Sequence, residues 1–212
     1  MKIANKTNAN YDANNGKIRK DGADTDSLST CLSNDTTLKN VYKRTFNTVN
    51  NNLLIDGGID DSLSGTTGIT VIVKGDVLYI GNVGDSRAII ASDVDGVPKF
   101  SPLSNDQTPF RKDERERLKK DGAHIMTLDQ IEGNEPIHDN WGAETGEEID
   151  EVGDPPRVWD STLERPGCAF TRSIGDAVAE KVGVYAEPEL LTWKIGEKDK
   201  LAIIASDGVF EF

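Results

Sequence analysis

The stretch ITVIVKGDVLYIGNVGDSRAIIA, residues 69–91, decides the fold class of this chain. Two runs rich in β-branched and aromatic residues, Ile69–Val73 and Val77–Ile80, flank a Lys-Gly-Asp sequence that is typical of a hairpin turn. A second turn, which contains Asp85, then leads into a further apolar run, Arg87–Ala91. The stretch therefore predicts consecutive antiparallel strands, and we interpret Asp85 as a turn residue.

Apolar residues before this stretch recur at the spacing of a helix. They are Leu38, Val41, Tyr42, Phe46, Val49 and Leu53. Asp35 or Thr36 can cap the start of the predicted helix, and Gly57-Gly58 ends it.

The downstream half predicts two helices and two strands. Residues 111–120 are highly charged and predict a helix in which Asp113 pairs with Arg117 one turn away. We expect a short helix over residues 176–181 and strands near 190–195 and 201–205.

Two segments show no regular period. Residues 1–34 are rich in Asn, Asp, Lys, Gly and Ser, and we interpret them as a disordered leader. Residues 129–166 carry many acids, Pro and Gly, with an acidic stretch over 144–154. That composition predicts a long irregular excursion on the surface.

The charge excludes two classes of partner. With 24 basic and 37 acidic residues the formal net charge is −13, so we expect neither nucleic acid nor an anionic membrane as a partner. No apolar run approaches the ~20 residues of a membrane span, and the first residues lack a signal peptide. Cys31 and Cys168 have no metal-site or redox spacing. We therefore expect a cytoplasmic or nuclear protein.

Five short motifs follow one another in a characteristic order. They are Ser64-Gly-Thr-Thr67, Gly81-Asn-Val-Gly-Asp-Ser-Arg-Ala88, Leu103-Ser-Asn-Asp-Gln-Thr-Pro109, Phe170-Thr-Arg-Ser-Ile-Gly-Asp176 and Ala205-Ser-Asp-Gly208. Their order and spacing resemble the PPM family of metal-dependent protein phosphatases, type 2C, over residues 35–212. Residues 106–212 look closest to a plant branch in which the phosphatase is fused to cyclic-nucleotide-binding and protein-kinase domains.

The resemblance implies a fold and an activity. The fold is a four-layer α-β-β-α sandwich, an α+β arrangement of two antiparallel sheets flanked by helices, with a flap near residues 111–165. The activity is hydrolysis of phosphoserine and phosphothreonine on proteins by a metal-activated water, with two or more Mg²⁺ or Mn²⁺ ions. Phosphorylated proteins would be the substrates, and kinase or cyclic-nucleotide-binding domains would be fused or associated partners.

The resemblance also implies site residues. Asp207 follows a short apolar run, so it ends a buried strand, where it resembles a metal ligand of the family. Asp176 resembles a ligand of a third metal, and a structural role for it stays open. Arg172 is a candidate for substrate phosphate, with a structural salt bridge as the alternative. We assign no catalytic residue, since no activated Ser or Cys nucleophile is evident.

Two parts of the family pattern are missing from this sequence. No Asp-Gly-His-Gly motif, which supplies the bridging carboxylate in the family, precedes Ser64, and no Asp-Asn motif follows Asp207. We therefore expect a partial phosphatase domain with little or no activity by itself, whose full-length form is active. Two alternatives remain: a non-catalytic phosphatase-like module that binds or regulates a partner, and a structural domain within a kinase fusion.

Overall fold

The computed structural model describes residues 11–12, 17–18, 35–141 and 153–210. The chain divides into two compact units, Met1–Asn40 and Val41–Phe212. The predicted leader lies outside the described residues except for β1 (Tyr11–Asp12) and β2 (Lys17–Ile18), which pair with each other. Helix α2 (Asp35–Ile55) confirms the helix predicted from the apolar period.

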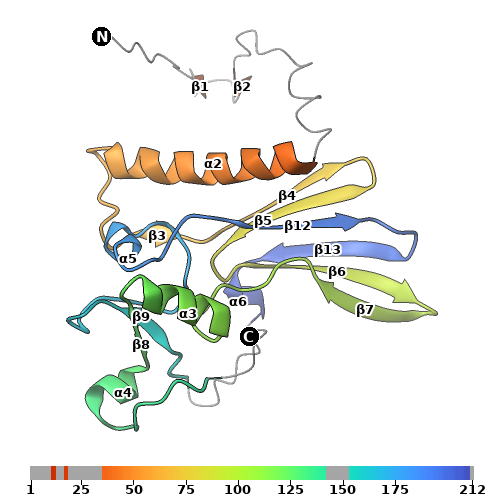
Figure 1. Cartoon of the computed structure of the whole chain (residues 1–212). Helices are drawn as coiled ribbons and strands as arrows, with labels where there is room; N and C mark the ends of the chain where they lie inside the picture. Colours follow the sequence, from red (N-terminus) through yellow and green to blue (C-terminus); the bar gives the residue numbers. More distant parts are fainter. Residues whose placement is uncertain (1–10, 13–16, 19–34, 142–152, 211–212) are drawn as a thin grey trace. The chain divides into compact units, whose positions relative to one another are not determined.

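Two three-stranded antiparallel sheets form the frame of the second unit (Figure 1). The first has the order β12-β5-β4 and the second the order β13-β6-β7. Their bounds are β4 (Gly68–Lys74), β5 (Val77–Val83), β6 (Arg87–Val94), β7 (Val97–Pro102), β12 (Glu189–Lys194) and β13 (Asp199–Ala205). The hairpin, the following strand and the two late strands are confirmed, whereas β7 was not predicted.

The two sheets bury alternate residues against each other, as expected for a sandwich. The shared core contains Leu78 and Ile80 from β5, Ala88 and Ile90 from β6, and Leu103 after β7. This arrangement confirms the predicted α+β sandwich of two antiparallel sheets.

The outer faces of the two sheets differ in how far other elements cover them. The part of helix α2 that belongs to the second unit, from Val41 onward, covers the first sheet, where the Tyr42 hydroxyl donates to the Tyr79 carbonyl at 2.9 Å. A Cβ at Gly81 would lie 2.7 Å from the Tyr42 ring, so glycine allows this close approach. On the outer face of the second sheet, Phe100 and Leu201 are 63% and 57% exposed. The sandwich is thus incomplete among the described residues, as the missing motifs predicted.

The second unit has a second small core, part of which falls within the segment predicted to be irregular, residues 129–166. Helix α3 (Lys112–Lys120) and helix α4 (Leu128–Glu132) accompany the sheet β10-β9-β8. The strands are β8 (His124–Met126), β9 (Arg157–Trp159) and β10 (Pro166–Cys168). Leu118 and Val158 are fully buried in this core. Helix α3 confirms the helix predicted over residues 111–120. The prediction of an irregular excursion over residues 129–166 was wrong where α4, β9 and β10 form, and residues 142–152 lie outside the described part.

Short elements complete the second unit and carry the candidate site. They are β3 (Gly65–Thr66), β11 (Ile174–Gly175), α5 (Ala177–Glu180) and α6 (Asp207–Phe210). Strand β11 pairs with β3, which brings the segment before Asp176 against the segment after Ser64. None of the helices in the described ranges is long and apolar enough to cross a membrane.

Candidate functional site

Motifs that are separate in the sequence lie close together in space, because they lie at or beside strand ends. Thr67 and Ser86 share a hydrogen bond between their hydroxyls at 2.7 Å. Arg87 pairs with Asp106 at 2.6 Å, and its guanidinium also lies over the Phe210 ring. These contacts join residues that are far apart in the sequence and place them at one end of the sandwich.

Asp207 lies where the sequence predicted, just after a sheet strand, β13. The prediction that this strand is buried was wrong, because none of the β13 residues is buried. In the β13–β6 ladder Ala205 is opposite Arg87. Because the two strands are antiparallel, Asp207, two residues after Ala205, and Asp85, two residues before Arg87, lie at the same end of the sheet. Asp207 is exposed, its Oδ1 accepts from the Gly208 amide at 2.7 Å, and it has no ion pair among the described residues. Asp85 lies in the turn between β5 and β6, as interpreted from the sequence.

Asp176 lies on a different segment and is partly buried. Its backbone is left-handed, with φ of 54°, and its amide donates to the Ser64 carbonyl at 2.9 Å. Its Oδ2 is buried and has no hydrogen-bond partner within the described ranges. The pKa of Asp176 is raised above its ordinary value chiefly by burial and further by the nearby carboxylate of Asp61, while the Ser173 side chain acts in the opposite direction. A buried acceptor without a donor is costly, so this position calls for a proton, a cation or water.

The carboxyl of Asp176 packs directly against Gly65, which gives a test of this geometry. A Cβ on Gly65 would lie 2.5 Å from the Asp176 Cγ and 2.8 Å from the Ile174 carbonyl oxygen. We expect Gly65→Ala to destabilise the protein by about 2 kcal/mol, because the Ile174 backbone on one side of the added methyl group cannot move away from it. Chemical denaturation measures this, with Gly57→Ala as the control, since nothing lies within 4 Å of a Cβ there. Equal stabilities for both variants would contradict the packing.

Arg172 forms ion pairs with two carboxylates, the buried Glu114 and the partly exposed Glu189. Its Nη2 is 2.6 Å from Oε1 of Glu114, its Nε donates to Oε2, and its Nη1 donates to the Glu187 carbonyl. Glu114 is 2% exposed and also pairs with Arg117 at 2.7 Å. This is the structural salt bridge that the sequence left open as the alternative for Arg172. Its role toward substrate phosphate stays a prediction.

The predicted pairing of Asp113 with Arg117 was wrong. Asp113 pairs with Arg111 at 2.6 Å, while Arg117 pairs with Glu114 at 2.7 Å. Arg111 also holds Glu189 of β12 through two hydrogen bonds, at 2.8 and 2.9 Å. The predicted pair failed because each member has a competing neighbour nearby in the chain: Arg111 lies two residues before Asp113, and Glu114 lies three residues before Arg117.

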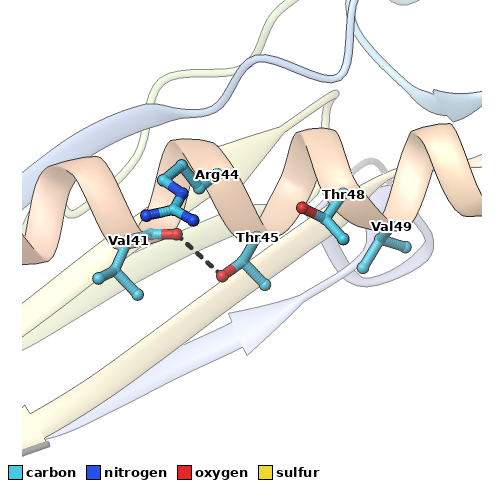
Figure 2. A pocket seen from close by; sticks show the side chains of 5 residues that line it. All are labelled: Val41, Arg44, Thr45, Thr48 and Val49. Carbon is cyan, nitrogen blue, oxygen red and sulfur yellow. Dashed lines mark hydrogen bonds between the residues drawn. The ribbon is translucent and has the colours of Figure 1, made fainter. Parts of the chain in front are cut away.

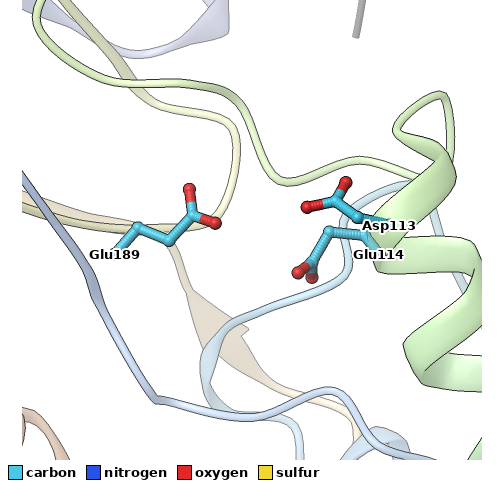
Figure 3. A group of neighbouring side chains, drawn as sticks. All are labelled: Asp113, Glu114 and Glu189. Atoms are coloured by element: carbon cyan, nitrogen blue, oxygen red, sulfur yellow. The ribbon is translucent and has the colours of Figure 1, made fainter. Parts of the chain in front are cut away.

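Figure 3 shows the cluster in which Asp113 and Glu114 of α3 face Glu189. One ligand atom from each lies within 4.8 Å of the others, a spacing that could hold a cation. Arg111, Arg117 and Arg172 already pair with these carboxylates. Their positive charges occupy the place of a metal, so the cluster is a structural network rather than a metal centre. Neither Asp207 nor Asp176 belongs to any such group of three among the described residues.

A shallow pocket lies away from these residues, on one face of helix α2. Figure 2 shows its lining residues, Val41, Arg44, Thr45, Thr48 and Val49, with the Thr45 hydroxyl donating to the Val41 carbonyl at 2.8 Å. The lining has one cation and no carboxylate. None of the predicted site residues lines it.

The geometry thus defines a protein class: an α+β sandwich with aspartates gathered toward one sheet end. Comparison with known families gives the same result. Residues 3–212 match the model of the family described as Protein phosphatase 2C. The chain belongs to the protein phosphatase 2C family, which confirms the resemblance seen in the five motifs.

Individual relatives agree with this assignment. The chain is 48% identical over 186 residues to "Probable protein phosphatase 2C 35" of Arabidopsis thaliana, covering 85% of this chain and 52% of that protein. It is 31% identical to "Probable protein phosphatase 2C 73" of Oryza sativa subsp. japonica, covering 99% of this chain and 46% of that protein. The chain therefore spans about half the length of the curated relatives it matches.

A solved structure shares the fold. The crystal structure of serine-threonine phosphatase 2C from Toxoplasma gondii has a TM-score of 0.64 with this chain at 16% sequence identity. The match covers 91% of this chain and 56% of that one. At this identity the likeness shows the fold alone, and it agrees with the sandwich described above.

Proposed function

We propose that this chain forms part of a metal-dependent phosphatase that hydrolyses phosphoserine and phosphothreonine on proteins. The observation that carries the proposal is the placement of Asp207 at the same sheet end as the turn that bears Asp85. Asp207 is an exposed carboxylate that has no ion pair with any residue the structure describes. Family membership supports the reaction class.

The donor chemistry of this sheet end suits a hard divalent cation. Mg²⁺ and Mn²⁺ prefer oxygen ligands, and Asp207 offers an oxygen that no arginine neutralises in the described part of the chain. We propose Asp207 as a ligand here and Asp176 as a separate ligand. Bound cations would acidify water and offset charge on the phosphoryl oxygens. Two carboxylates supply only part of the roughly six oxygens each cation prefers, so the site needs further ligands.

The protein's own residues position these acids. The β13–β6 ladder fixes Asp207 because Ala205 is held opposite Arg87, and Arg87 is held by Asp106. The β3–β11 pair fixes Asp176 through its bond to Ser64. Since rigid strands hold both acids, we expect their positions to change little on ligand binding.

A second candidate function follows from a different observation. Asp207 and Asp176 form no three-carboxylate group among the described residues, which favours a phosphatase-like module that binds phosphoproteins without hydrolysing them. Under either function we propose phosphorylated proteins as partners and the cytoplasm or nucleus as the location. Fused or associated kinase and cyclic-nucleotide-binding domains are a further proposal, which rests on the sequence resemblance alone.

Phosphate release distinguishes the two functions. We would express the protein at its full natural length and measure hydrolysis of a phosphothreonine peptide with Mn²⁺, and again after EDTA treatment. The enzyme proposal predicts turnover with Mn²⁺, loss of turnover in EDTA and recovery on adding Mn²⁺. Binding of the phosphopeptide without any hydrolysis would support the binding module and contradict the enzyme.

A further inference from the structure

We propose that Phe210 is a positioning residue, whose ring packs against Arg87, holds helix α6 in place and thereby sets the direction of the Asp207 carboxylate. The inference rests on the proposed function, because the direction of Asp207 matters only if Asp207 binds a metal. It concerns an aromatic residue three positions after Asp207 that the sequence analysis did not single out.

Helix α6 has little burial of its own to hold it in place. It contains only the four residues Asp207–Phe210, none of which is buried, and Val209 is 60% exposed. Two of its hydrogen bonds are local, from the Gly208 amide to Oδ1 of Asp207 and from the Val209 amide to the Ser206 carbonyl. A single helical turn gains too little from such bonds to be stable by itself. A contact with another element must therefore fix its orientation.

The ring of Phe210 makes such a contact with the guanidinium of Arg87 on strand β6. The Arg87 Cζ lies 5.2 Å from the centroid of the ring, within the range of a cation–π interaction. The face of an aromatic ring carries partial negative charge, so the guanidinium attracts it electrostatically as well as by packing. The contact joins α6 to the strand beside the one from which α6 emerges.

Arg87 is itself held firmly, which makes it a suitable anchor. Its Nε and Nη2 donate to the two carboxylate oxygens of Asp106, at 3.0 and 2.6 Å. A bidentate pair of this kind fixes the plane of the guanidinium. In the β13–β6 ladder Arg87 is opposite Ala205, two residues before Asp207. Arg87 therefore fixes the chain before α6 through the ladder and the end of α6 through the ring.

The contact of Phe210 bears directly on Asp207, because both residues lie on one helical turn. A tilt or rotation of so short a helix moves both side chains together. Without the ring contact, α6 would open more readily, and the Asp207 carboxylate would sample several directions. A cation would then bind less tightly, since its ligand would have to be ordered on binding.

The test replaces Phe210 in the full-length protein and measures Mn²⁺ binding directly, from the electron paramagnetic resonance signal of free Mn²⁺. Phe210→Leu keeps an apolar side chain and removes the ring, whereas Phe210→Tyr keeps a ring. Phe100→Leu is the matched control, because Phe100 lies on β7 of the same sheet and is 63% exposed. We expect the apparent Mn²⁺ dissociation constant to rise about threefold or more for Phe210→Leu. Phe210→Tyr and Phe100→Leu should match the wild type.

A double-variant cycle separates positioning from a general loss of stability. Asp106→Asn removes the charge that fixes Arg87, so it should also weaken Mn²⁺ binding. If Asp106 acts through Arg87 and Phe210, combining Asp106→Asn with Phe210→Leu should weaken binding no further than the more damaging single change. Unchanged binding in Phe210→Leu, an equal loss in Phe100→Leu, or losses that add in the double variant would overturn the inference and leave the phosphatase proposal intact. A wild-type protein that binds no Mn²⁺ would overturn both.

Discussion

Asp207→Asn in the full-length protein is expected to lower Mn²⁺-dependent dephosphorylation by about 100-fold or more. Asparagine keeps the size of the side chain and an oxygen that can accept from the Gly208 amide, which Asp207 bonds at 2.7 Å. It loses the negative charge that a divalent cation requires. Phosphate release from a phosphothreonine peptide, measured over a range of Mn²⁺ concentrations, checks the result.

The matched control is Asp76→Asn, which removes the same charge from the turn between β4 and β5. Asp76 is 65% exposed, and its contact with Lys194 is long at 3.7 Å, so we expect activity and stability to stay close to wild type. Equal activity of Asp207→Asn and Asp76→Asn would show that Asp207 holds no metal needed for the reaction.

Glu114→Gln is expected to destabilise the protein by about 3 kcal/mol, roughly 6–12 °C in Tm. Glu114 is 2% exposed and accepts from Arg117, Arg172 and the Thr171 hydroxyl. The neutral amide would leave two partly buried guanidinium groups without this counter-charge. Thermal and urea unfolding measure the loss, with exposed Glu116→Gln on the same helix as the control. A loss no larger than that of Glu116→Gln would contradict the network.

The same residue predicts a pH dependence of stability. Burial acts to raise the pKa of Glu114, but hydrogen bonds from Arg172 and Arg117 outweigh it and lower the pKa from 4.5 to about 2. Because the folded pKa is depressed, the contribution is fully present above about pH 4.5 and is lost as pH falls toward 2. The stability difference between wild type and Glu114→Gln should therefore stay constant above pH 5 and shrink below 4.5. A difference that grows on acidification would contradict this sign.

The sequence predicted the strands of the sandwich because their apolar runs are continuous and separated by clear turn signals. Residues 69–91 form strands at every predicted run. Strand β7 was missed because Pro98, Lys99 and Pro102 give it no apolar period. The elements α4 and β8–β10 were missed because each has only three to five residues, too few to show a period.

The sequence could predict individual site residues but not how they lie relative to one another. The apolar run before Asp207 located it at the end of a strand, and β13 has that form. The buried Gln107 bonds to Asn82, Gly84 and Thr171, which come from distant segments, so spacing along the sequence could not predict these contacts. The arginines that neutralise Asp113, Glu114 and Glu189 likewise become visible only in three dimensions.

Locating bound Mn²⁺ tests the central claim most directly. We would crystallise the full-length protein with Mn²⁺ and collect anomalous diffraction data. The account predicts anomalous density beside the Asp207 carboxylate, at the sheet end that carries Asp85, and none within the Asp113–Glu114–Glu189 cluster. Density between those three carboxylates, with none beside Asp207, would contradict it.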